Sequence, residues 1–196
     1  MNSKRRSLVA AVVVLVTLRS GPAIRAQQRP VDVARSTLTV FVYKSGLFAA
    51  FADNHTIKAP IASGSLVEGE SPSIELSIRA GDLTVVDREL SADKRAEVQS
   101  RMVSAEVLDV AKFPTITFAS TSIKPTASDR WSVSGTLTLH GRTQPITFTV
   151  TRADRRYRGE VVIKQRDFGI EPIRVAGGTV RVKDEVKVAF EIVGGS

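Results

Sequence analysis

The chain has 196 residues, 42% of them hydrophobic, and no cysteine, which excludes disulfide bonds and thiolate metal sites. Its formal net charge is +8, but residues 1–26 hold five basic residues and no acidic one, so the remainder carries about +3. Such a small excess is no electrostatic footprint for nucleic acid, which is not expected as a partner.

The first 26 residues have the order of a secretory signal peptide. Three basic residues at 4–6 precede an apolar run at 8–18, and small residues follow up to Ala26. A transmembrane anchor is the alternative, but this run is shorter than the roughly twenty residues that a spanning helix needs. We therefore expect residues 1–26 to be removed on export. Residues 27–196 then form one domain in the periplasm or outside the cell, without a transmembrane segment.

Most of the remaining chain consists of runs in which apolar and small polar residues alternate. Ile146, Phe148 and Val150, for example, alternate with threonines. A period of two is typical of strands that bury one face of an antiparallel sheet. The clearest runs cover residues 36–44, 114–121, 134–140, 143–151 and 156–164. With the shorter runs, they predict an all-β fold: a lipocalin-like, eight-stranded, antiparallel up-and-down barrel.

Residues 91–104 break this alternation and predict one surface helix. Ala, Lys, Arg, Glu and Gln dominate the segment, Ser91 is a suitable N-cap, and Asp93 lies in the first turn where a carboxylate favours the helix dipole. Further along, His140-Gly141 separates two alternating runs and predicts a two-residue hairpin turn.

Four separated segments resemble the YceI-like family. They are AKFPTITFAST (111–121), GTLTLHGRTQPI (135–146), RDFGI (166–170) and GGTVRVKDEVKVAFEI (177–192). The predicted helix precedes the first of them, as it does in that family. The resemblance implies a lipocalin-like barrel that binds a polyisoprenoid or similar long-chain lipid in the cell envelope, as a non-catalytic carrier.

Candidate catalytic residues are few. The chain has two histidines, and a catalytic zinc site normally needs three protein ligands, so no metal site is predicted. Asp53 and His55 lie two residues apart, on one side of an extended segment, and are interpreted either as an acid/base or ligand-gripping pair at a cavity mouth or as a strand cap. The alternatives to a carrier are therefore a hydrolase or isomerase of a small hydrophobic substrate, or a protein-interaction module.

Phenylalanines are the better indication of a binding site. Seven of the eight fall in predicted strands or at their ends, and an apolar lining with few polar groups is what a lipid site requires. No cofactor is expected other than a bound lipid, and no oligomeric state is predicted. The predicted cavity residues are Phe41, Phe48, Phe51, His55, Phe118, Phe148 and Phe168.

Overall fold

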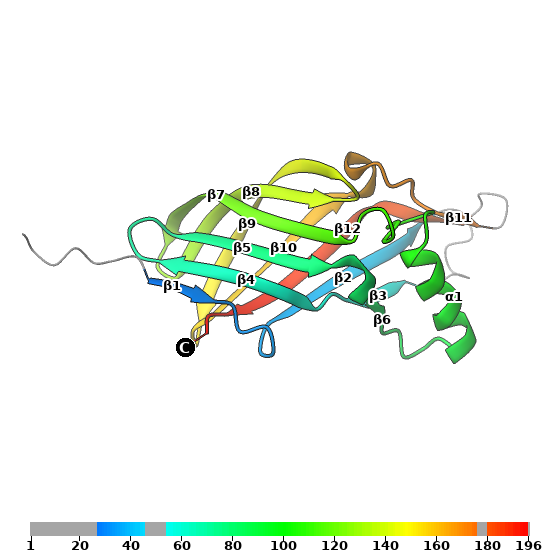
Figure 1. The fold of residues 1–196 in the computed structure, drawn as a ribbon, viewed down its shortest axis with the longest axis horizontal. Coiled ribbons are helices and arrows are strands. Elements are labelled where there is room, and N and C mark those ends of the chain that lie inside the picture. The colour runs from blue at the N-terminus through cyan, green and yellow to red at the C-terminus, as the bar shows by residue number, and fades with distance from the viewer. Residues whose placement is uncertain (1–26, 46–53, 176–179, 196) are drawn as a thin grey trace, which may run out of the picture.

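The computed structural model describes residues 27–45, 54–175 and 180–195, which form one antiparallel sheet with a single α-helix (Figure 1). The first part of the chain supplies β1 (Gln27–Pro30), β2 (Thr37–Ser45), β3 (His55–Lys58), β4 (Ile61–Glu68), β5 (Ser73–Arg79), the 3₁₀ turn η2 (Ala80–Asp82) and β6 (Thr84–Val85). The second part supplies α1 (Ala92–Val103), β7 (Thr115–Ala127), β8 (Arg130–Leu139), β9 (Arg142–Ala153), β10 (Arg156–Lys164), the 3₁₀ turn η3 (Gln165–Phe168), β11 (Arg174–Val175) and β12 (Val180–Val193).

The predicted helix and hairpin turn are both confirmed. Helix α1 begins after Ser91, whose Oγ accepts a hydrogen bond from the Lys94 amide at 3.4 Å. His140 and Gly141 connect β8 to β9 with φ angles of 51° and 72°, the positive values that a tight hairpin turn requires. Within the described ranges, no helix combines the length and apolar character needed to cross a membrane.

The all-β class is confirmed, but the predicted number of eight strands is wrong. The described part of the chain forms a sheet of twelve strands, of which eight have seven or more residues. The other four, β1, β3, β6 and β11, have two to four residues. Strands this short cannot show alternation in the sequence. In addition, Pro60, which has no amide hydrogen, separates β3 from β4.

The sheet curls until its first strands, β1 and β4, meet the end of β12, the last strand of the chain. The strand order is β1-β4-β5-β7-β8-β9-β10-β12-β2-β3-β6, with β11 on β12. Val31, directly after β1, donates its amide to Gly64 of β4 at 2.9 Å and forms a β-bridge with Gly194, directly after β12. The Gly195 amide also donates to the Pro30 carbonyl at 2.7 Å. Backbone hydrogen bonds therefore join the β1–β4 side of the curled sheet to β12.

The two ends of this curled sheet differ (Figure 1). At one end, called the mouth end here, lie the hairpin turns β4–β5, β7–β8 and β9–β10. At the other, the helix end, lie α1, β6 and η3. The Gln99 side chain attaches α1 to the sheet: its Oε1 accepts from the Val85 amide and its Nε2 donates to the Leu83 carbonyl, both at 2.9 Å.

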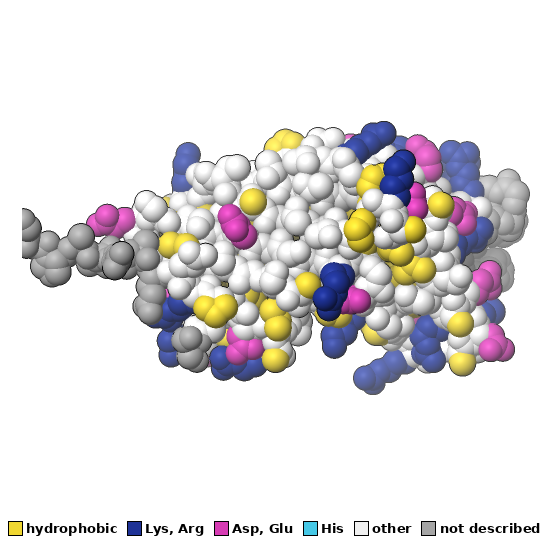
Figure 2. Space-filling view, viewed as in Figure 1, with side chains coloured by type: hydrophobic (Ala, Val, Ile, Leu, Met, Phe, Trp, Pro, Cys, Tyr) yellow, Lys and Arg dark blue, Asp and Glu magenta, His cyan; other side chains and the backbone are white. Residues whose placement is uncertain are grey.

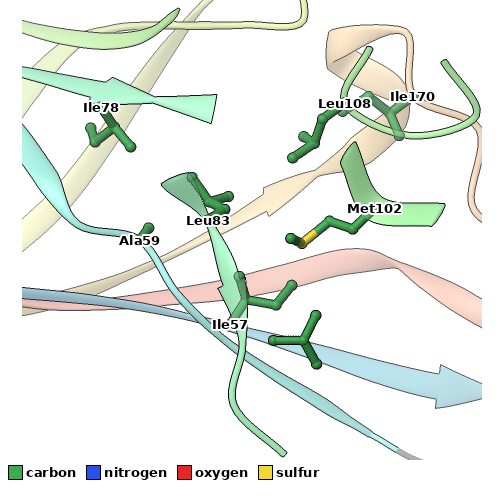
Figure 3. Close-up of a cluster of buried hydrophobic side chains, with 8 residues drawn as sticks. Ile57, Ala59, Ile78, Leu83, Met102, Leu108 and Ile170 are labelled. Atoms are coloured by element: carbon green, nitrogen blue, oxygen red, sulfur yellow. The ribbon is translucent and has the colours of Figure 1, made fainter. Parts of the chain in front are cut away.

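The helix end is filled with apolar side chains. Figure 3 shows Met102 of α1 and Leu108 beyond it directed toward Ile57 of β3 and toward Leu83, which lies directly before β6. The buried cluster consists of Ile57, Ala59, Ile78, Leu83, Val85, Met102, Leu108 and Ile170. A second cluster, Ile163, Phe168 and Val186, adjoins η3, and Phe168 is only 1% exposed. This end of the molecule is an ordinary close-packed core.

The outer wall is polar but carries few charges in the face shown by Figure 2, where charged side chains gather toward the ends. Neighbouring hydroxyls on its strands bond to each other, as Thr138 does to Thr143 at 2.8 Å and Ser134 to Thr147 at 2.9 Å. The threonines that alternate with apolar residues in the sequence therefore form the outer face, and the apolar set faces inward.

Candidate functional site: an apolar cavity with a polar mouth

A cavity of ≈ 430 Å³ occupies the inside of the curled sheet, between the mouth end and the core of the helix end. Of the described residues that line it, all but Glu68, Gly69, Arg152 and Tyr157 have apolar side chains. The lining residues Ile163, Leu137 and Ile146 also belong to the cluster around Phe168, so that cluster forms the floor.

Strand alternation explains which side chains reach the cavity. On several walls the lining residues are spaced by two, as in Ile74, Leu76 and Ile78 of β5. The same spacing holds on β9, with Ile146, Phe148, Val150 and Arg152, and on β12, with Val188, Phe190 and Ile192. The cavity is thus built from eight strands, whose inward side chains face one another because the sheet curls.

Two inward positions are occupied by glycine, and an aromatic ring covers each. Gly159 follows the inward spacing of Tyr157 and Val161 on β10 and pairs with Phe190 of β12. A Cβ built at Gly159 would lie 2.6 Å from Phe190 Cζ. Gly135 of β8 stands in the same relation to Phe118, at 2.5 Å. Larger residues at these two positions would push the rings into the cavity.

Three aromatic rings pack against each other inside the cavity. The ring centres of Phe118 and Phe148 are 5.5 Å apart, and those of Phe148 and Phe190 are 5.4 Å apart in an edge-to-face arrangement. All three residues line the cavity. They offer a smooth apolar surface and no hydrogen-bonding group, which suits a hydrocarbon chain.

Polar groups gather where the cavity opens at the mouth end. Tyr157 donates its hydroxyl hydrogen to Glu68 Oε1, and this bond links β10 to β4. Burial raises the pKa of Tyr157 above its usual 10.0, and the Glu68 hydrogen bond raises it further. Arg152 bonds to Asp129 Oδ1 through Nε and Nη2, at 3.0 and 2.8 Å, and its guanidinium lies 5.5 Å from the centre of the Trp131 ring.

The structure brings only part of the predicted residue set together. Phe118 and Phe148 line the cavity, whereas Phe48 and Phe51 lie outside the described residues. Phe168 is buried in the floor. Phe41 faces outward, because Val40 and Val42 take the inward positions of β2 and Lys187 Nζ lies 5.1 Å from the Phe41 ring centre. Phe41 and Phe168 are therefore not among the described residues that line the cavity.

His55 is not at the mouth either. It begins β3, opposite Val42 near the helix end, and is absent from the cavity lining. Its Nδ1–H donates to Asp87 Oδ2 at 2.8 Å, while Asp87 Oδ1 accepts from the Thr56 amide at 2.6 Å. Arg95 of α1 donates to the Asp87 carbonyl at 2.8 Å. His55 and Asp87 thus tie β3 to the segment before α1, and Asp53, the partner predicted from sequence, lies outside the described residues.

The second histidine is also structural. His140 Nδ1 is 3.3 Å from the Phe168 carbonyl oxygen, and its ring centre lies 4.5 Å from that of Phe113. In the described part of the chain, no three His, Asp or Glu side chains are grouped so that they could hold a metal ion.

Sequence reasoning missed several residues of the site, chiefly Phe190, Trp131 and Tyr157. Each lies at an inward position of an alternating strand, so the period of two was a usable signal. The link between Tyr157 and Glu68 had no signal, since the two residues are 89 positions apart.

The curled antiparallel sheet and its internal cavity place the chain among β proteins with an enclosed apolar site. More specifically, the chain belongs to the YceI-like domain family, whose pattern matches residues 30–194. A UPF0312 protein of Pseudomonas putida is 46% identical over 56 residues, 29% of each chain. Protein YceI of Salmonella arizonae is 40% identical over 113 residues, covering 46% of this chain and 59% of that protein. The chain thus matches less than two thirds of the length of these relatives.

Two solved structures share the fold. BcnA of Burkholderia cenocepacia superposes with a TM-score of 0.59 at 18% identity, over 83% of this chain and 98% of BcnA. A polyisoprenoid binding domain from Saccharophagus degradans, implicated in plant cell wall breakdown, gives 0.55 at 17% identity, over 86% of this chain and 97% of that domain. At such identities the likeness concerns the fold alone.

Proposed function

We propose that this protein is an exported, non-catalytic carrier of an isoprenoid or similar long-chain lipid. The observation that carries the proposal is the cavity, whose ≈ 430 Å³ volume falls within the range typical of small-molecule sites. Its lining offers hydrocarbon surface along the walls and polar groups only at the mouth. Phe118 and Phe148, at the centre of this lining, are the predicted residues expected to contact the ligand.

Burial of hydrocarbon supplies enough free energy for such a ligand. Each CH₂ group transferred from water to an apolar environment contributes about 0.8 kcal/mol. A strand of nine residues spans roughly 30 Å, so the curled sheet can shield a long chain lengthwise. A prenyl or acyl chain therefore needs no charged anchor in the cavity.

Three further observations support this function. One of the structural neighbours that share the fold is itself a polyisoprenoid binding domain. Among the described residues, the lining contains no histidine, and its ionisable groups, Glu68, Arg152 and Tyr157, are already engaged with each other or with neighbouring side chains. Export is supported by the basic, apolar and small residues of segment 1–26.

The carrier function is tested with two neighbouring residues of β10. Val161 lines the cavity, whereas Val162 faces outward and is 58% exposed. Val161→Phe should fill part of the cavity and weaken binding of geranylgeraniol at least tenfold. Val162→Phe adds the same volume on the outside and should leave affinity within twofold of the original protein. Equal affinities of the two variants, or no lipid binding by the unchanged protein, would exclude an internal lipid site.

Export and the natural ligand are tested together. Native mass spectrometry of protein gently purified from the cell envelope should show a chain that starts near Gln27 and carries one bound lipid. A cytoplasmic chain that retains Met1 would contradict export, and a protein that turns over a small hydrophobic substrate would contradict the non-catalytic role.

A further inference from the structure

The apolar walls of the cavity do not determine which head group the ligand carries. The charges at the mouth of the cavity do bear on its identity. Among the described residues that line the cavity, two carry a charge, Glu68 and Arg152, and their signs are opposite. A site for a phosphorylated head group is normally built from basic groups that outnumber the nearby carboxylates. The described lining of this cavity has no such excess.

Arg152, the one cation of the described lining, already has a carboxylate partner. Arg152 places Nε and Nη2 on Asp129 Oδ1 at 3.0 and 2.8 Å, and its backbone amide donates to the Asp129 carbonyl at 2.8 Å. A cation–π contact also holds the guanidinium of Arg152 in place, because it lies over the Trp131 ring. A diphosphate could bind Arg152 only by displacing Asp129 or by approaching with that carboxylate beside it.

The single carboxylate of the lining opposes an anion directly. Glu68 accepts the hydroxyl hydrogen of Tyr157 and has Arg29 Nη1 at 3.9 Å from its Oε2. Its negative charge lies at the position a head group would occupy, next to the β4–β5 turn. An anionic head group would meet like charge there, whereas a neutral one would not.

Unused hydrogen-bonding capacity remains for an uncharged oxygen. A guanidinium has five N–H donors, of which Arg152 uses two on Asp129. The Tyr157 oxygen, whose hydrogen goes to Glu68, can accept a hydrogen bond. A hydroxyl group can use both, and a carbonyl oxygen can accept from Arg152, without separating either ion pair.

From this arrangement we infer that the cavity selects lipids with an uncharged oxygen head group, a hydroxyl or a carbonyl, and discriminates against prenyl phosphates and diphosphates. The inference rests on the proposed carrier function, and it names Glu68 and Asp129 as the residues that set the selectivity.

The experiment compares two ligands with the same chain, geranylgeraniol and geranylgeranyl diphosphate. Trp131 is the one tryptophan of the chain and lines the cavity beside Arg152, so its fluorescence reports binding at the mouth without any label. At neutral pH and moderate salt, the alcohol should bind at least tenfold more tightly, a difference of about 1.4 kcal/mol. Equal or tighter binding of the diphosphate would overturn the inference and leave the carrier function standing. Binding of neither lipid would contradict the carrier function itself.

Variants then locate the selectivity. Glu68→Gln and Asp129→Asn should each strengthen diphosphate binding about threefold or more while leaving the alcohol within about twofold. Glu160→Gln is the matched control, since Glu160 lies on the outer wall with Lys187 at 3.5 Å and changes the net charge equally. A gain in diphosphate affinity as large in Glu160→Gln as in the mouth variants would mean that net charge, rather than the mouth, sets the preference, and would overturn the assignment.

Discussion

The two ends of the curled sheet use the same kind of strand for different purposes. At the helix end, α1 and η3 cover the opening, and Met102, Leu108 and Phe168 fill the interior. At the mouth end, the described residues form hairpin turns and no helix, and the interior remains a cavity. Alternation alone does not separate a core from a binding site. The difference arises from what covers the end of the sheet and from glycines at inward positions.

The largest expected effect is the removal of a ring from the helix end. Phe168→Ala should lower the free energy of unfolding by about 3–5 kcal/mol, because the ring is buried and its loss leaves a cavity. Phe41→Ala is the matched control: its ring lies on the outer face near Lys187, and its loss should cost about 1 kcal/mol. Urea unfolding followed by circular dichroism measures both. Similar losses would mean that the two rings are equally buried, contrary to the structure.

The next effect concerns His55, which the sequence left open as a residue of the cavity mouth or as a strand cap. Asp87→Ala removes the acceptor for both His55 Nδ1 and the Thr56 amide, and Asp87 is only 9% exposed. We expect a loss of about 1.5–3 kcal/mol in the free energy of unfolding, typical of hydrogen bonds to a charged group. Affinity for geranylgeraniol should stay within twofold, because these residues do not line the cavity. A tenfold loss of affinity without loss of stability would show that His55 contributes to ligand binding.

How far the sequence predicts this molecule differs between local and long-range features. The α1 cap at Ser91 and the turn at His140-Gly141 depend on neighbouring residues and could be read directly. The outward direction of Phe41 also follows from the strand period of two, because Val40 and Val42 on either side of it face inward. The prediction for Phe41 rested instead on the apolar character of its ring. A phenylalanine at an outward position indicates nothing about the interior.

The long-range features could not be predicted in this way. Whether inward side chains meet across the interior depends on the curvature of the sheet, which is set by pairings such as Val31 with Gly194 between the two ends of the chain. The same holds for the mouth, where Glu68 and Tyr157 come together across 89 positions. Short strands such as β6 exist only because β3 is already in place beside them.

A substitution at the inward glycine Gly159 tests whether this position keeps the Phe190 ring out of the cavity. Gly159→Ala places a Cβ 2.6 Å from both Phe190 Cζ and the Thr149 carbonyl oxygen, and the latter belongs to the backbone. We expect a cost of about 1–3 kcal/mol in stability and a weaker affinity for geranylgeraniol, as Phe190 is pushed into the cavity. Gly81→Ala, whose Cβ would meet nothing within 4 Å, is the control and should change neither quantity. Unchanged affinity in Gly159→Ala would show that Phe190 has room to move elsewhere.

The smallest effect is a pH dependence at the mouth. The pKa of Tyr157 is raised above its usual 10.0 by burial first and by the Glu68 hydrogen bond second, while Arg152 partly opposes the change. A group with a raised pKa in the folded state holds its proton more tightly than in the unfolded chain. Its contribution to stability is therefore complete below pH 10 and is lost as the pH rises through the higher folded value.

Above pH 10, the unchanged protein should lose stability more steeply than Tyr157→Phe, which has no proton to release. The difference between the two urea-unfolding curves, measured at pH 8 and again above pH 10, isolates this hydroxyl from the other titrating groups. Parallel losses in both proteins would show that the Tyr157–Glu68 bond does not hold the proton, and that the link between β4 and β10 is weaker than its geometry indicates.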